Sequence, residues 1–152
     1  ADAGLLIGDA AMRADVLLKE RGNPEDLYVV DLGESWKIFT GEAMVFAVWV
    51  IHKDFGSNEP EKVEEAIRAL SESREWGYQN REHLIKVGQA RSPEFSAEYL
   101  NKYMDTIQYS FDKNYRRALC LFFDYAYKSG LIPERVKIAV WGEDSANTTY
   151  TG

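Results

Sequence analysis

The apolar stretch at residues 44–51 is the feature that most limits how this chain can fold. It contains three valines, an isoleucine, a phenylalanine and a tryptophan, which are residue types that favour strands. The stretch has the length of a strand and is shorter than most helices. A strand that is apolar at every position is normally buried on both faces, as in a sheet covered by helices. These residues therefore predict an α/β fold.

Three further segments are interpreted as strands. Residues 3–7 form a short apolar run that ends at Gly8-Asp9, and residues 10–21 follow with apolar side chains at helical spacing. Such a strand–turn–helix unit is the building block of α/β folds. The other two strand candidates are residues 27–32 and 136–141.

The chain after residue 58 has the periodicity of helices. Pro60 suits the first turn of a helix that we expect to run to about residue 90, with weak points at Gly77 and Gly88. Another helix is predicted to start at Ser92-Pro93, and a third is predicted to run from Asp112 as its cap to Gly130. The fold class is therefore α/β, with buried strands near the N-terminus and a helix-rich C-terminal half. We predict one domain over residues 1–138 and a strand-like end with a loose polar tail over residues 139–152.

Charge and composition exclude several classes of function. The net charge of -7 gives no electrostatic basis for broad binding of nucleic acid, and it argues against binding to anionic lipid. One cysteine, Cys120, and two histidines make a metal site implausible. No apolar run has the length of a membrane span, and no signal peptide is recognisable. We expect a cytoplasmic protein without a metal site.

Gly8, Asp9 and Ala10 are candidate ligand-binding residues, because they follow a predicted strand and open a helix. Ligands collect at the carboxyl ends of strands in open sheets, and a helix N-terminus favours anions. The functional interpretation is that backbone N–H groups of these residues bind a carboxylate. The alternative is that Asp9 only caps the helix.

Four further candidates surround the strongest strand. The hydroxyl of Thr40 and the N–H of Gly41 could hold a polar ligand group, and a turn without a ligand is the simpler interpretation. Phe46 and Trp49 could flank a ring-shaped substrate, and packing in a core is the competing interpretation. His52 and His83 are interpreted as surface residues, and Cys120 as a small buried apolar residue.

Two blocks of the sequence resemble the chorismate dehydratase family of the futalosine route to menaquinone. The first is the LLIGDAAM segment at residues 5–12. The second comprises Asp31-Leu32-Gly33, Trp36, Thr40-Gly41 and the VFAVW run at residues 45–49. The order and spacing of the blocks agree with the family, and the resemblance covers about residues 1–133. The sister family of dihydroxynaphthoate synthases shares the Thr-Gly turn and lacks the VFAVW run.

The resemblance implies a fold, a reaction and a position within the family. The implied fold is that of type II periplasmic solute-binding proteins, with the substrate between two lobes. The implied reaction is the loss of water from chorismate to give 3-enolpyruvylbenzoate, without a metal or redox cofactor. The family's N-terminal Tyr-Leu-Asn segment is not found here, so the chain corresponds to the C-terminal portion and supplies part of the substrate cleft. Residues 42–44 also depart from the family's Leu-Pro-Phe.

Three roles follow from these expectations. The first is a chorismate dehydratase whose catalytic residues we do not assign, with Gly8, Asp9, Ala10, Thr40, Gly41, Phe46 and Trp49 binding the substrate. The second is a binding lobe without catalysis for a small aromatic carboxylate. The third is a fragment that associates with itself, or with a missing N-terminal half, through an exposed sheet edge.

Overall fold

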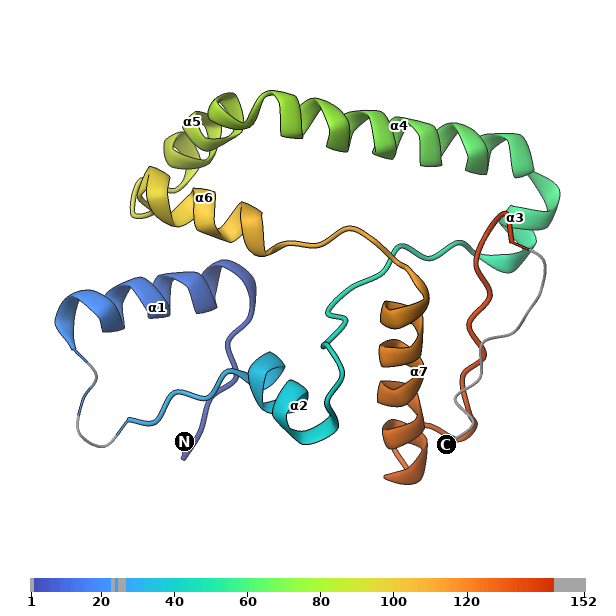
Figure 1. The fold of residues 1–152 in the computed structure, drawn as a ribbon, viewed down its shortest axis with the longest axis horizontal. Coiled ribbons are helices and arrows are strands. Elements are labelled where there is room, and N and C mark those ends of the chain that lie inside the picture. Colours follow the sequence, from blue (N-terminus) through green and yellow to red (C-terminus); the bar gives the residue numbers. More distant parts are fainter. Residues whose placement is uncertain (1, 23, 25–26, 144–152) are drawn as a thin grey trace. The chain divides into compact units, whose positions relative to one another are not determined.

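The computed structural model describes residues 2–22, 24 and 27–143 (Figure 1). The chain divides into two compact units. The first unit comprises Ala1–Tyr28 and Val50–Gln108, and the second comprises Val29–Trp49 and Tyr109–Gly152. Each unit takes its residues from two separate parts of the chain, so neither unit corresponds to one half of the sequence.

The described residues of the first unit form five helices. They are α1 (Gly8–Arg21), α3 (Lys53–Asn58), α4 (Pro60–Gln79), α5 (Arg81–Arg91) and α6 (Ala97–Thr106). Pro60 begins α4, where its missing N–H costs no hydrogen bond. The hydroxyl of Ser96 caps α6 by accepting from the N–H of Tyr99 at 3.1 Å. The buried apolar side chains of this unit are Val63, Ile85 and Phe95.

Arg81 joins α5 to α6, which lie side by side in Figure 1. Its guanidinium donates to the side-chain oxygen of Asn101 at 2.7 Å and pairs with the carboxylate of Asp105 at 2.6 Å. Gly88 of α5 lies so close to α6 that an added Cβ would be 3.1 Å from a methyl group of Leu100. The two helices are therefore held by polar contacts at one end and by close packing at the other.

The second unit contains α2 (Leu32–Thr40) and α7 (Lys113–Lys128). Asp31 caps α2 by accepting from the N–H groups of Gly33 at 2.8 Å and Glu34 at 3.0 Å. Asp112 caps α7 in the same way. The buried apolar residues all lie on α7 and are Ala118, Leu119, Cys120 and Leu121.

Trp36 connects the two helices of this unit. Its ring makes edge-on contacts with Phe122 and Tyr125, each at a centroid distance of 5.5 Å. Phe39 contacts Tyr125 at the same distance. The four rings pack α2 onto α7 with the geometry that aromatic pairs prefer.

The prediction of an α/β fold with buried N-terminal strands is wrong, and with it the expected fold of periplasmic solute-binding proteins. The structure is 62% helical, and its described residues form no sheet. Residues 3–7 and 44–51 have no regular secondary structure, and most of their side chains are exposed. Residues 27–32 end in a helix instead, because Asp31 caps α2. Residues 136–141 contain one isolated bridge, at Ile138.

The physical reason is that a strand depends on a neighbour. Its N–H and C=O groups pair with another strand, whereas a helix satisfies its own groups. Residues 44–51 have strand-forming side chains, but no described segment pairs with them in a sheet. Their composition therefore favours a strand, but the described residues provide no neighbouring strand with which it could pair.

The helices agree better with the sequence. The helix predicted over residues 10–21 corresponds to α1, and the helix capped by Asp112 corresponds to α7. The long helix predicted to residue 90 is interrupted at Asn80, whose side chain donates to the carbonyl of Trp76 at 2.8 Å. Neither Gly77 nor Gly88 breaks a helix. Both allow close packing, because an added Cβ would be 3.2 Å or less from a leucine side chain.

Two other expectations concern the C-terminal end and the membrane. Among the described residues, no helix is both long and apolar enough to cross a membrane. The predicted loose tail at residues 139–152 lies mostly outside the described residues, which end at Glu143. The prediction of one domain over residues 1–138 stays a prediction.

Candidate functional site

The N-terminus of α1 has no side-chain cap. Gly8 opens the helix with a φ of 56°, a conformation that glycine adopts without strain. The capping position belongs to Ile7, whose side chain has no hydrogen-bond acceptor. Asp9 lies inside the first turn. The backbone N–H groups at this helix end, at Gly8, Asp9 and Ala10, therefore have no side-chain cap, and the end carries partial positive charge.

Thr40 and Gly41 use their polar groups to close the end of α2. The hydroxyl of Thr40 donates to the carbonyl of Trp36 at 2.8 Å and accepts from the N–H of Glu42 at 3.1 Å. The N–H of Gly41 donates to the carbonyl of Lys37 at 2.8 Å, and its φ is 78°. This geometry favours the turn interpretation, and substrate binding by these two residues stays a prediction.

Phe46 and Trp49 are exposed. Their side chains are 80% and 83% accessible, so neither is part of a core. The ring of Phe46 lies over Gly33, where an added Cβ would be 2.8 Å from the ring edge. Because both rings are open, they remain available to a ring-shaped ligand.

The seven candidate residues fall into two groups. Gly8, Asp9 and Ala10 belong to the first unit. The other four, Thr40, Gly41, Phe46 and Trp49, belong to the second. The structure thus gives two candidate binding elements, and each is considered by itself.

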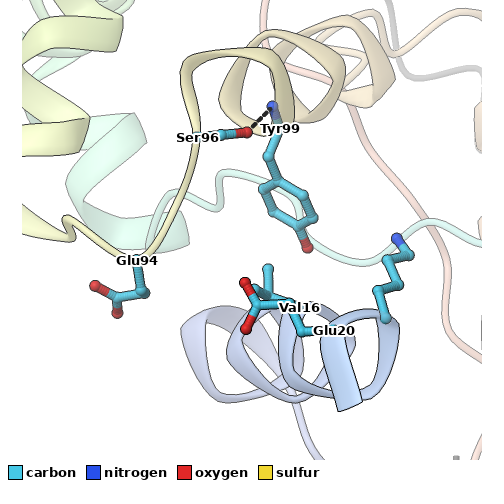
Figure 2. A pocket seen from close by; sticks show the side chains of 6 residues that line it. Val16, Glu20, Glu94, Ser96 and Tyr99 are labelled. Carbon is cyan, nitrogen blue, oxygen red and sulfur yellow. Dashed lines mark hydrogen bonds between the residues drawn. The ribbon is translucent and has the colours of Figure 1, made fainter. Parts of the chain in front are cut away.

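A shallow pocket of about 190 Å³ lies in the first unit, at residues that were not predicted from the sequence (Figure 2). Two residues on the last turns of α1, Lys19 and Glu20, line it together with Val16. The remaining lining residues come from the start of α6 and the loop before it, and they are Glu94, Ser96 and Tyr99. Their positions in the sequence give no signal that they meet, because the two segments are far apart in the chain.

Tyr99 forms one side of this pocket and contacts α1 directly. Its hydroxyl donates to a carboxylate oxygen of Asp15 at 3.1 Å, and the same oxygen accepts from the ammonium group of Lys19 at 2.6 Å. The Lys19 nitrogen lies 5.7 Å from the centre of the Tyr99 ring. Burial and the neighbouring carboxylate raise the pKa of Tyr99, so its hydroxyl remains a donor at neutral pH.

A second ion pair joins α1 to the loop before α6. Arg13 pairs with Glu94 at 2.5 Å. The backbone N–H of Glu94 and then Arg13 lower the pKa of the Glu94 carboxyl. The hydrogen bond from Lys19, and a weaker one from Tyr99, lower the pKa of Asp15.

Because of these two carboxylates, we expect the attachment of α1 to α6 and to the loop before it to weaken in acid. Their pKa values in the folded protein lie below the unfolded values, so they stabilise the attachment above pH 4–5 and lose this effect as the pH falls further. We expect the NMR signals of the Tyr99 ring to shift in an acidic titration of the wild type. The titration step of these signals that is assigned to Asp15 should be absent in Asp15→Asn. A step that persists in this variant would contradict the assignment.

The histidines and the cysteine offer no competing site. The imidazole of His52 is 78% exposed and lies 3.9 Å from the carboxylate of Asp54. His83 packs edge-on against Trp76. Cys120 is buried in α7, and burial raises the pKa of its thiol. In the part of the chain that the structure describes, no group of three His, Cys, Asp or Glu residues could hold a metal ion.

Comparison with known proteins identifies the family. No solved structure matches this chain. A family model described as menaquinone biosynthesis matches residues 1–128. The match spans both blocks on which the resemblance rests, at residues 5–12 and 31–49, and the predicted family is confirmed. The chain therefore belongs to the menaquinone biosynthesis family.

Proposed function

We propose that this chain takes part in the dehydration of chorismate to 3-enolpyruvylbenzoate and binds a carboxylate of the substrate at the N-terminus of α1. The observation that carries the proposal is the family match over residues 1–128. A role in menaquinone biosynthesis follows from the family. The specific reaction is our proposal, and it rests on the residues of the two sequence blocks.

The reaction makes simple demands on a protein. A base removes a ring proton, the released electron pair enters the new aromatic ring, and the hydroxyl group departs and is lost as water. The substrate carries two carboxylates, so binding it requires donors placed for anions. Holding it away from bulk water strengthens those contacts.

The N-terminus of α1 has the properties of such an element. Its backbone N–H groups have no side-chain cap, and the helix dipole adds partial positive charge. The carboxylate of Asp9 opposes an incoming anion, so binding must rely on the backbone alone. We therefore expect Asp9 to reduce the affinity.

Phe46 and Trp49 form a second candidate binding element, which belongs to the second unit and is tested by itself. Both rings are exposed, and aromatic rings of this kind stack on planar ligands. Trp49 is also a convenient reporter, since its indole is 83% accessible and a bound ring would change its emission. These contacts are tested separately from those of α1, by replacing Phe46 or Trp49 with leucine.

Two substitutions at Asp9 isolate the role of its N–H group. Asp9→Asn removes the charge and keeps the N–H, whereas Asp9→Pro removes both. Proline is tolerated in the first turn of a helix, so α1 should still form. We expect Asn to tighten chorismate binding about threefold, by relieving repulsion near the helix end. We expect Pro to bind about tenfold more weakly than Asn, because a charge-assisted hydrogen bond is lost.

The measurement is an isothermal calorimetric titration of the full chain with chorismate, followed by chromatography for 3-enolpyruvylbenzoate. Circular dichroism of each variant checks that α1 is intact. Absence of saturable chorismate binding by the wild type would overturn the proposal. Binding without any product would instead favour a binding lobe for small aromatic carboxylates.

A further inference from the structure

Helix α1 is held weakly by apolar packing. None of its residues is buried. Within the part of the chain that the structure describes, its polar contacts with other elements go to two residues near the start of α6. Glu94 pairs with Arg13, and Tyr99 reaches Met12 and Asp15.

Tyr99 is the more specific of these two contacts. Its hydroxyl lies 3.1 Å from a carboxylate oxygen of Asp15 and 3.5 Å from the backbone carbonyl of Met12. The ring is held in turn by stacking on Phe95, at 5.4 Å with an angle of 11° between the planes. Phe95 is 2% exposed, so the ring of Tyr99 rests on the buried part of the unit. Figure 2 shows the hydroxyl directed toward α1.

We propose that Tyr99 is a positioning residue, whose hydroxyl clamps α1 to α6 and thereby fixes the direction in which the N-terminus of α1 presents its N–H groups. This inference rests on the proposed function of that helix end. Asp15 lies six residues after Asp9, about 9 Å along the axis at 1.5 Å per residue. A helix of this length is stiff, so a clamp near its middle sets the direction of its end.

The clamp depends on one oxygen atom. Phenylalanine at position 99 would keep the stacking on Phe95 and the apolar wall of the pocket, and it would lose the donor to Asp15. Arg13 and Glu94 cannot replace that donor, because their side chains are 53% and 37% exposed and their ion pair is screened by water. The hydroxyl therefore contributes orientation beyond simple attachment.

The experiment compares Tyr99→Phe with Tyr103→Phe. Tyr103 lies one turn further along α6 and is 45% exposed, so the control loses the same atom from the same helix. Hydrogen exchange followed by mass spectrometry reports on the α1 amides without ligand. Calorimetric titration at a temperature well below unfolding reports on chorismate affinity. We expect Tyr99→Phe to speed α1 exchange about tenfold and to weaken binding three- to tenfold, with little change in Tyr103→Phe.

A double-mutant cycle separates positioning from general stability. If Tyr99 positions the helix end, the difference between Asp9→Pro and Asp9→Asn should shrink when Tyr99→Phe is also present. A purely structural role would leave that difference unchanged and would overturn the inference. Unchanged α1 exchange in Tyr99→Phe would overturn it as well. Faster exchange in a chain whose wild type binds no chorismate would remove the proposed function, and the positioning role with it, and would leave a structural clamp.

Discussion

Replacing Phe95 with alanine is expected to lower the free energy of unfolding of the first unit by about 3–5 kcal/mol. Phe95 is the most buried large side chain of that unit, with 2% of its surface exposed. Its removal leaves a cavity under the stacked ring of Tyr99. The loss combines the transfer free energy of the ring with the cost of the cavity.

Urea denaturation followed by far-ultraviolet circular dichroism measures this effect. Phe46→Ala is the matched control, since it removes the same ring from a site that is 80% exposed. We expect the control to change the free energy of unfolding by less than about 0.5 kcal/mol. Equal effects of the two substitutions would show that residue 95 is not in a core.

Replacing Asp124 with alanine is expected to lower the free energy of unfolding of the second unit by about 2 kcal/mol. Asp124 is 5% exposed on α7, and its carboxylate pairs with Lys128 at 2.7 Å and with Arg135 at 3.1 Å. Arg135 also lies over the ring of Tyr127. The carboxylate thus ties α7 to the segment that follows it. The cost is below that of a fully buried pair, because both cations are more than half exposed.

The two cations provide the comparison. Lys128→Ala and Arg135→Ala each remove one partner and leave the other on the carboxylate, so we expect each to cost less than about 1 kcal/mol. Thermal unfolding of the three variants at one pH and salt concentration gives the ranking. A larger loss for either cation than for Asp124 would contradict the assigned role of the carboxylate.

Helices were predictable from the sequence where their signals are local. Asp112 caps α7 through the N–H groups of Asn114 and Tyr115, two and three residues away. Propensity, cap and apolar stripe all agree there. Residues 44–51 carry an equally strong signal, but a strand needs a partner that a local pattern does not contain. The α/β prediction failed for this reason.

The candidate site shows the same difference between local features and contacts that join distant parts of the chain. The sequence predicted a helix near this position, but it placed the start at Ala10 with Asp9 as the cap, whereas α1 begins at Gly8 and has no side-chain cap. The contact between Tyr99 and Asp15 joins residues 84 positions apart, so no spacing rule could find it. The family was predicted because its two blocks are runs of specific residues, which identify relatives without any knowledge of the fold.

The exposed apolar segment at residues 44–51 also affects the association of molecules with one another in solution. Trp49 and Val50 are more than 80% accessible, so these apolar side chains favour association between copies of the chain. Electrostatic repulsion between the like-charged copies opposes this association. That repulsion vanishes near the isoelectric point of about 4.9. Colloidal stability is therefore lowest in mildly acidic buffer, and dilute samples well above that pH suit the chain best.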